Sequence, residues 1–409
     1  MSTVGCRSCG GDRLVSFLDL ARTPLPDALV DPADDLSAEE WYPLEVAFCP
    51  DCTLVQILEE VSAEKMFVDN YHYFSSFSDH LLAHSREHAL GLVASRRLDA
   101  DSLVVELASN DGYLLKNFVE AGVPVLGIDP SPGPAEAAVA AGVPTLQEFF
   151  GIDMAERLVS EGRQADVIIA NNVMAHVPDL NGFVAGMRVL LADDGLITVE
   201  NPYVRDLIEH CEFDTIYHEH YCYFSCSSVD RLMRRHGLWL NDVEYFADLH
   251  GGTLRWHIGH HDQRTDRLRR YLADEREQGL TEAGYYLQFA DRVDGVRAGL
   301  RTLVTELRAD GKRVAAYGAA AKGAMMLNHT GLDGDLVEFV VDRNVHKQGK
   351  LMPGTHQAVR SPDSLLTDRP DYVLLLAWNF KDEIMAQQAD YLAQGGRFIV
   401  PVPQPEVVA

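Results

Sequence analysis

The sequence predicts an α/β protein with two separate doubly wound domains and a small cysteine-containing module at the amino terminus. Two series of short apolar runs, each separated by helix-like segments, support the first part of this prediction. Apolar runs of ~4–8 residues that alternate with helices are typical of parallel strands covered on both faces. Two Cys-x-x-Cys pairs among the first 52 residues support the second part.

The chain has 409 residues, which is enough for two or three domains. Four segments are expected, in this order: the cysteine-bearing module 1–62, a first α/β domain 63–260, a helical linker 261–309 and a second α/β domain 310–409. The linker is predicted to be helical because apolar residues such as Leu300, Leu303 and Leu307 recur at helical spacing.

Each α/β domain has its own set of predicted strands. In the first domain, a helix over 113–121 follows the first of four strands, which are expected at 103–107, 125–128, 167–170 and 196–199. In the second domain, strands are expected at 313–317, 337–341, 372–376 and 397–400. In such sheets, ligands bind beyond the carboxyl ends of the strands.

The formal net charge of -27 excludes two classes of partner. A strongly acidic surface repels phosphate backbones and anionic lipids, so we expect neither nucleic acid nor membrane as a partner. No apolar run approaches the ~20 residues that span a bilayer. The first residues lack the pattern of a signal peptide, so a cytoplasmic protein is expected.

The turn after the first strand is the predicted cofactor site. It begins at Glu106, continues through small polar residues to Gly112, and lies 23 residues before Asp129, which ends the second strand. A carboxylate at that second position typically accepts hydrogen bonds from a ribose. The turn is acidic and lacks the G-x-G-x-x-G pattern of a diphosphate site, which favours a cationic nucleoside without phosphate; S-adenosylmethionine is such a ligand. The simpler alternative is a polar turn with no ligand.

Two further positions lie near this predicted site. Phe149 lies at the end of a further strand region, 147–150, and is expected to flank the adenine, although packing into the core is equally consistent with the sequence. Asn171 directly follows the strand expected at 167–170. The complete set of predicted cofactor contacts is Glu106, Ala108, Asn110, Asp111, Gly112, Asp129, Phe149 and Asn171.

Three polar clusters are candidates for the chemistry. His176 follows the strand expected at 167–170, where a catalytic role and a structural role are about equally consistent with its position. The segment 213–224 is the densest cluster of polar and aromatic residues, and it contains Tyr217, Glu219 and His220. A carboxylate beside a histidine can orient the ring and raise its basicity, as a general base requires. The third cluster, 70–76, holds aromatic residues that either bind substrate oxygens or pack at a domain joint.

The metal ligands are predicted to be Cys6, Cys9, Cys49 and Cys52. Two Cys-x-x-Cys pairs, with 39 residues between Cys9 and Cys49, can supply four thiolates in a tetrahedral arrangement. Such a closed site leaves no coordination position for water or substrate, so we expect structural zinc. A module of this size cannot build a sufficient hydrophobic core without a cross-link such as a bound metal ion.

The segment 105–112 resembles the first motif of class I methyltransferases, in the branch that has the pattern E-x-G-x-N-D-G. Ala108 departs from this pattern, because the family has glycine there. Over nearly the whole chain, the motifs together resemble the deoxysugar C-methyltransferases of bacterial antibiotic pathways. The shared motifs are the clusters 71–76, 171–176 and 217–220 and the sequence His250-Gly251-Gly252. The resemblance implies a zinc domain, a methyltransferase domain and a carboxy-terminal Rossmann-like domain.

The resemblance also implies a reaction. Family members methylate carbon in a nucleotide-linked 4-keto-6-deoxy sugar, commonly at C3 and in some members at C5, and a dTDP carrier is expected. By this resemblance His220 is the base, Glu219 is its neighbour, and Tyr217, Tyr71 and His176 contact the sugar or the enolate oxygen. The residues expected to bind the rest of the substrate are Tyr73, Lys322, Lys347 and Asn379.

Two other functions are compatible with parts of the sequence. A nicotinamide-dependent oxidoreductase or epimerase would use the turn 318–323 of the second α/β domain. This turn contains a lysine and precedes a predicted helix, so it is a reasonable diphosphate site. The missing glycine fingerprint counts against this function. A non-catalytic, zinc-stabilised binding module would require the predicted base and cofactor turn to lie far apart.

Overall fold

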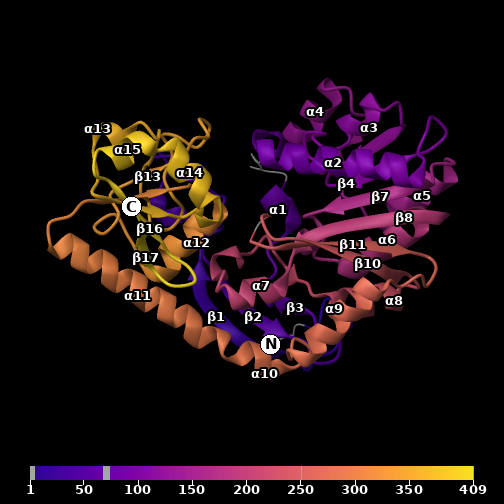
Figure 1. Cartoon of the computed structure of the whole chain (residues 1–409), viewed down its shortest axis with the longest axis horizontal. Helices are drawn as coiled ribbons and strands as arrows, with labels where there is room; N and C mark the ends of the chain where they lie inside the picture. Colours follow the sequence, from indigo (N-terminus) through magenta and orange to yellow (C-terminus); the bar gives the residue numbers. More distant parts are fainter. Residues whose placement is uncertain (1–4, 68–73, 250, 409) are drawn as a thin grey trace.

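A computed structural model describes residues 5–67, 74–249 and 251–408 of the chain. The two α/β domains lie side by side, and the amino-terminal sheet and a long helix lie below and between them (Figure 1). The expected residues Tyr71, Tyr73 and His250 lie outside the described part of the chain.

The amino-terminal sheet has four antiparallel strands in the order β1-β2-β3-β9, namely β1 (Val15–Thr23), β2 (Tyr42–Phe48), β3 (Val55–Ile57) and β9 (Cys222–Tyr223). The last strand, β9, comes from the first α/β domain. It pairs with β3, with Val55 opposite Tyr223 and Gln56 opposite Cys222. The short helix α1 (Ala63–Phe67) then leads out of the sheet. This sheet is therefore completed by the segment in which the sequence predicts the base.

The sheet of the first α/β domain has seven strands in the order β10-β11-β8-β7-β4-β5-β6. Its strands are β4 (Val104–Leu107), β5 (Val125–Ile128), β6 (Thr145–Leu146), β7 (Ala165–Asn171), β8 (Leu191–Pro202), β10 (Trp239–Phe246) and β11 (Thr253–Gly259). The strands from β4 to β8 are parallel, as expected, and β10 and β11 add an antiparallel edge that the apolar runs do not indicate.

Helices cover both faces of this sheet (Figure 1). On one face lie α2 (Asp79–Arg96), α3 (Lys116–Glu120) and α4 (Pro132–Ala140). The other face carries α5 (Ile152–Ser160), α6 (Leu180–Leu190) and α8 (Cys226–Arg235), and the short helix α7 (Val204–Glu209) follows β8. The helix expected to begin at Tyr113 begins later, at Lys116, because residues 113–115 form turns.

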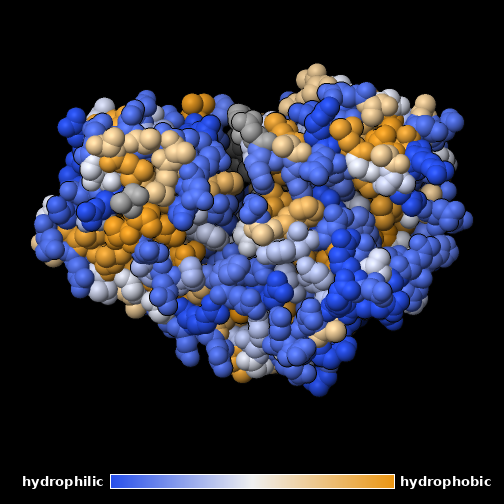
Figure 2. Space-filling model, in the orientation of Figure 1, coloured by the Kyte–Doolittle hydropathy of each residue, from blue (hydrophilic) through white to orange (hydrophobic). Residues whose placement is uncertain are grey.

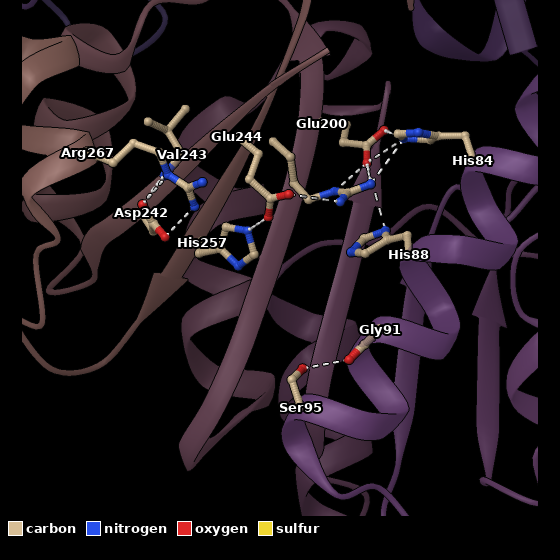
Figure 3. Close-up of polar contacts among 11 residues, drawn as sticks. His84, His88, Gly91, Ser95, Glu200, Asp242, Val243, Glu244, His257 and Arg267 are labelled. Carbon is tan, nitrogen blue, oxygen red and sulfur yellow. Dashed lines mark hydrogen bonds and ion pairs between the residues drawn. The ribbon is translucent and has the colours of Figure 1, made fainter.

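Helix α2 is fastened to the sheet by a buried ionic network (Figure 3). Glu200 of β8 lies at the centre, where the Nε atom of Arg255 donates to it at 2.6 Å and His84 Nε2 lies 3.1 Å from both carboxyl oxygens. Burial raises the pKa of Glu200, but the hydrogen bond with His84 and the charge of Arg255 outweigh burial and lower the pKa to about 2. The fully partnered carboxylate therefore stays ionised and holds α2 in place.

Three helices connect the two α/β domains: α9 (Asp266–Glu277), α10 (Ala283–Leu287) and α11 (Phe289–Ala309). They pack against the amino-terminal sheet, where the ring of Tyr286 stacks on that of Phe48 at 4.8 Å and lies 5.3 Å from that of Phe17. The segment between β1 and β2 also reaches the carboxy-terminal domain, because Val30 and Leu351 exchange two main-chain hydrogen bonds.

The carboxy-terminal domain contains a six-stranded sheet in the order β14-β13-β12-β15-β16-β17. Its strands are β12 (Val314–Tyr317), β13 (Val340–Val341), β14 (Val359–Arg360), β15 (Tyr372–Leu375), β16 (Arg397–Val400) and β17 (Glu406–Val408). Its helices are α12 (Ala321–Thr330), α13 (Ser364–Thr367), α14 (Lys381–Gln387) and α15 (Ala389–Ala393). The strand expected at 337–341 is shorter than predicted, although Val337 and Phe339 are buried beside it.

The surface is hydrophilic over most of the face in Figure 2, which also shows a notch between the two α/β domains. Within the described ranges, no helix combines the length and the apolar character needed to cross a membrane.

Candidate active site

The predicted cofactor turn lies at the carboxyl end of β4. Asn110 donates its main-chain N–H to Asp129 Oδ2 at 2.8 Å, and Ser131 donates its main-chain N–H to Oδ1 of the same carboxylate at 2.8 Å. Burial raises the pKa of Asp129, while these main-chain hydrogen bonds oppose the rise. Asp129 therefore fixes the shape of the turn from the end of the neighbouring strand β5.

The turn presents buried polar atoms that lack hydrogen-bond partners among the described residues. These atoms are Glu106 Oε2, Ser109 Oγ, Asp111 Oδ1 and Asn171 Oδ1. Glu106 is 1% exposed, and burial together with the neighbouring charges of Asp129 and Asp111 raises its pKa well above the usual value. A buried polar group without a partner is costly unless a ligand supplies one. An acidic set of acceptors fits a cationic ligand rich in donors, which S-adenosylmethionine is.

Ala108 adopts the left-handed conformation that the family pattern assigns to glycine. Its φ of 55° is unusual for a residue with a side chain, and Asn110 and Gly112 in the same turn have φ values of 48° and 76°. An L-residue in this region carries a cost of ~1–2 kcal/mol. The chain therefore keeps the backbone path of the motif with alanine in place of glycine.

Phe149 and Asn171 differ in their surroundings. Asn171 is buried at the end of β7, next to β4 in the sheet. Phe149 is 44% exposed, whereas the adjacent Phe150 packs edge-on against Phe183 of α6 at 5.5 Å. Of the two aromatic residues, Phe150 packs into the core and Phe149 is available at the surface.

The cofactor turn also holds the chain that follows α1. Ser75 donates its main-chain N–H to Asn110 Oδ1 at 2.9 Å, and Ser76 donates its main-chain N–H to Asp111 Oδ2 at 3.2 Å. These residues belong to the cluster 70–76, in which the sequence places substrate contacts. Part of that cluster is therefore attached directly to the cofactor turn.

Three predicted catalytic side chains come together from two segments. The His220 ring lies 4.7 Å from that of His176 and 4.1 Å from that of Tyr217, measured between centroids. His176 belongs to the 3-10 turn η3 (Met174–His176), directly after β7, and Tyr221 donates its N–H to the Ala175 carbonyl at 2.8 Å. Because β7 pairs with β4, this group lies at the same sheet edge as the cofactor turn.

A main-chain carbonyl fixes the orientation of His220. Its Nδ1 atom lies 2.8 Å from the oxygen of Thr215, so Nδ1 carries the proton and the lone pair resides on Nε2. Glu219, the neighbour in the sequence, is buried, and its pKa is raised well above the usual value by burial and by Asp27, against the charge of Lys347. The partner of Nδ1 is thus a backbone oxygen, whereas the sequence points to a carboxylate.

His176 remains uncharged near neutral pH. Burial lowers its pKa to about 4, although the backbone of Glu219 acts in the opposite direction. Its Nδ1 atom is buried without a hydrogen-bond partner in the described part of the chain. A neutral imidazole in this position is suited to a hydrogen bond with a polar substrate atom.

The carboxy-terminal domain has a matching turn with the opposite charge. Gly318, with φ of 108°, follows β12, and Ala319 donates its N–H to Asp342 Oδ2 at 2.7 Å. The Lys322 Nζ atom is buried without a hydrogen-bond partner within the described ranges and lies 4.7 Å above the Trp378 ring. Lys347 donates from Nζ to the Ala319 carbonyl at 2.8 Å.

Lys322, Lys347 and Asn379, three of the residues predicted to bind substrate, lie at or beside this turn. Asn379 lies in η5 (Trp378–Phe380), adjacent to the tryptophan beneath Lys322. An uncapped helix amino terminus together with a buried ammonium group is a suitable site for an anion.

The four predicted metal ligands form one cluster. The ligand atoms of Cys6, Cys9, Cys49 and Cys52 all lie within 4.8 Å of one another, and none of the four forms a disulfide. Gly10 and Thr53, with φ values of 72° and 63°, donate main-chain N–H groups to the carbonyls of Cys6 and Cys49 and thereby close the two knuckles. Four thiolates at this spacing fit tetrahedral zinc, with Zn–S distances of ~2.3 Å.

Two functional contacts do not follow from the sequence patterns. Asp214 lies inside the predicted cluster 213–224, but its partner Trp378 lies in the other α/β domain. The role of Thr215 involves its main-chain carbonyl, which no side-chain pattern reveals. The only signal available for Asp214 is its position at the start of the polar-aromatic cluster.

Three family models match consecutive parts of the chain. A zinc binding domain matches residues 6–67, a methyltransferase domain matches 76–242, and a C-methyltransferase C-terminal domain matches 248–403. The chain is also similar to C-methyltransferase NovU of Streptomyces niveus, with 38% identity over 408 residues that cover 99% of this chain and 96% of the relative.

Solved structures show a more distant likeness. Magnesium protoporphyrin IX methyltransferase from Synechocystis PCC 6803 with bound SAM is 15% identical and covers 48% of this chain and 88% of its own, at a TM-score of 0.34. The CcbJ methyltransferase from Streptomyces caelestis is 17% identical and covers 43% and 88%, at a TM-score of 0.33. At TM-scores this low, the likeness adds nothing to the assignment.

Proposed function

We propose a function from the premise that this chain belongs to the C-methyltransferase family, as its near full-length relative shows. It is an S-adenosylmethionine-dependent C-methyltransferase of the class I fold with a zinc-binding amino-terminal domain. We propose that it methylates a sugar carbon next to the C4 ketone of a dTDP-4-keto-6-deoxy sugar, with C3 favoured over C5, in the biosynthesis of an antibiotic.

One observation carries this proposal. His220, with its Nδ1 proton held by the Thr215 carbonyl, lies against Tyr217 and His176 at the sheet edge that also bears the cofactor turn. A base with its lone pair on Nε2, next to hydroxyl and imidazole groups, suits removal of a proton from carbon beside a ketone. Proximity to the cofactor turn also disfavours a non-catalytic binding module.

The proposed reaction begins with proton transfer. Nε2 of His220 accepts the proton from the sugar carbon, and the electron pair of the broken C–H bond delocalises into the C4 carbonyl to give an enolate. Tyr217 and His176 stabilise the enolate oxygen, and donors of this kind are typically worth ~3–4 kcal/mol of barrier lowering. Tyr71 is assigned to the same oxygen by resemblance to the family.

Bound S-adenosylmethionine would supply an electrophilic methyl group to the enolate carbon, with its sulfur as the leaving group. We assign Glu106, Asp111 and Asn171, with their buried acceptor atoms, to the donors of this cofactor. Asp129 is assigned to the ribose, Asn110 and Gly112 to the turn around it, and Phe149 to the adenine.

The remaining substrate contacts are assigned to the carboxy-terminal domain and to the cluster 70–76. Lys322 and Lys347 would neutralise the diphosphate, Asn379 would contact the nucleotide, and Tyr73 the sugar. Glu219 would lie beside the base without taking its proton. We further propose that the zinc domain ends near residue 62, that the methyltransferase domain covers 63–260, and that a helical linker 261–309 precedes the sugar-nucleotide domain 310–409.

The test is mass spectrometry of the purified enzyme with S-adenosylmethionine and a panel of dTDP-4-keto-deoxysugars, followed by NMR to locate the new methyl group. We expect S-adenosylhomocysteine to form only with 4-keto sugars. The variant His220→Ala should lose at least about a hundredfold in kcat, as expected for removal of a general base. His261→Ala, which removes an exposed histidine after β11, is the matched control and should retain wild-type activity. Near-normal turnover in a folded His220→Ala protein would refute the assigned base.

A further inference from the structure

The turn that holds the base also contacts the other α/β domain. This 3-10 turn, η4 (Phe213–Thr215), offers the Thr215 carbonyl to His220 Nδ1 at 2.8 Å. The preceding residue, Asp214, is fully buried, and its Oδ2 atom accepts the Nε1–H of Trp378 at 2.7 Å. Two adjacent residues of one turn therefore connect His220 to the carboxy-terminal domain.

Trp378 extends this connection to the proposed diphosphate site. The face of its ring lies 4.7 Å from Lys322 Nζ, the buried ammonium group that lacks a hydrogen-bond partner in the described part of the chain. Burial raises the pKa of Asp214 to about 6, and the nearby charge of Lys322 acts against this rise. Lys322, Trp378 and Asp214 thus form a continuous series of contacts between the two sites.

Apolar packing supports the same connection. Phe213, at the start of η4, places its ring 5.2 Å from the ring of His329, near the end of α12. This helix begins at Ala321, directly after Gly318–Ala320, so its amino end faces the proposed diphosphate and its flank lies against η4. Packed contacts of this kind transmit small displacements between elements.

We propose that Asp214 is a positioning residue for the base, because its hydrogen bond from Trp378 ties the turn that orients His220 to the turn that binds the sugar nucleotide. The diphosphate and the base are then aligned as one unit, so a nucleotide bound at Lys322 places its sugar carbon against Nε2. This inference rests on the proposed function for the identity of the substrate. Neither Asp214 nor Trp378 contacts the reacting atoms in this proposal.

The first experiment measures kcat and KM in variants of this connection. Trp378→Phe keeps an aromatic ring beneath Lys322 and removes only the Nε1–H donor. We expect kcat to fall about tenfold, as for one lost buried hydrogen bond, with KM for the sugar nucleotide changed less than about threefold. Asp214→Ala should match it, whereas Asp214→Asn retains an acceptor oxygen and should keep kcat within about threefold of wild type.

The matched control is Tyr391→Phe. It also removes a buried hydrogen-bond donor within the carboxy-terminal domain. The tyrosine hydroxyl donates to the Pro370 carbonyl at 3.0 Å and to the Arg397 carbonyl at 3.4 Å, and neither bond reaches η4. We expect wild-type kcat from this variant. A loss as large as that of Trp378→Phe, or equal losses in Asp214→Asn and Asp214→Ala, would overturn the proposal.

The second experiment does not require turnover. Histidine-labelled ¹⁵N protein is titrated with dTDP, and the His220 ring signals are identified by their absence in His220→Ala. We expect dTDP to shift these signals in the wild type and to shift them less than half as far in Trp378→Phe at equal saturation. Failure of dTDP to bind, or equal shifts in both proteins, would overturn the connection. If no 4-keto sugar is methylated but the shift depends on Trp378, the proposed function fails and the connection stands.

Discussion

Asp129 and Asp342 occupy the same place in the two α/β domains, at the end of the second strand, and each accepts two main-chain N–H groups at 2.7–2.8 Å. The turns that they hold differ in charge. The turn after β4 is surrounded by buried carboxyl groups, whereas the turn after β12 carries a buried ammonium group. Under the proposed function, the same backbone arrangement holds turns for ligands of opposite charge, and the side-chain charge distinguishes the two turns.

Among the expected changes in ligand affinity, the largest comes from removing the acidic character of the first turn. Glu106→Gln should weaken S-adenosylmethionine binding about 10- to 100-fold, as measured by calorimetry, because a hydrogen bond to an ionised group is lost. Since the folded-state pKa of Glu106 is raised, its ionisation destabilises the apoprotein as pH rises above about 4.5, the usual value. The apoprotein of the variant should therefore be more stable than wild type at pH 8. Unchanged affinity for S-adenosylmethionine would show that the acidic groups of the first turn do not select its ligand.

The reciprocal change, in the turn after β12, should affect only the binding of the nucleotide. Lys322→Met is expected to raise the Kd for dTDP about tenfold and to leave the affinity for S-adenosylmethionine unchanged. Lys312→Met is the matched control, because Lys312 precedes β12 at the opposite end of the strand and pairs with Asp371 at the surface. Equal losses in both lysine variants would show that the second turn has no special anion site.

The pH dependence of the unfolding free energy distinguishes Glu200, a carboxylate that stabilises the fold, from Glu106, a carboxylate proposed to bind a ligand. The pKa of Glu200 is about 2 in the folded protein and 4.5 as the ordinary value, so its stabilising contribution is complete above pH 4.5 and is lost as pH falls toward 2. The contribution is on the order of 3 kcal/mol. Urea unfolding of the wild type and Glu200→Gln between pH 6 and 3 should therefore show curves that converge at low pH. Parallel curves would contradict the assigned network.

The smallest effect is expected at Ala108. Ala108→Gly relieves a left-handed alanine, which favours the folded state by about 1 kcal/mol, and adds freedom to the unfolded chain, which offsets part of this gain. We expect unfolding free energies within about 1 kcal/mol of each other and an S-adenosylmethionine Kd within about threefold of wild type. A tenfold gain in affinity would show that the alanine methyl group crowds the cofactor.

The apolar runs predicted the parallel strands because both faces of those strands are buried. The bounds of β5 and β16 agree with the prediction to the residue. The strand β11 escaped prediction because Arg255 interrupts its apolar pattern, and the carboxylates of Glu200 and Glu244 make a buried arginine acceptable there. Local patterns reveal burial on two apolar faces but not a charge that is neutralised by a distant residue.

The candidate site was predictable wherever one segment carries the signal. The thiolate cluster follows from the cysteine spacing, and the cofactor turn follows from the end of a strand. The role of His220 came from the family resemblance, and no sequence pattern placed it beside His176. The link from Trp378 to Asp214 joins residues separated by 164 positions, and the oxygen that orients His220 belongs to the main chain. Contacts of either kind depend on tertiary packing and leave no pattern in the sequence.

The pairing of β3 with β9 has a consequence for biosynthesis on the ribosome. Val55 emerges long before Tyr223, its neighbour in the finished sheet. The zinc knuckles can close early, because all four cysteines lie among the first 52 residues, but the edge of β3 stays open until residue 223 has left the exit tunnel. During that interval the nascent chain exposes an unpaired strand edge, which closure of the knuckles does not cover and which is a potential site of aggregation.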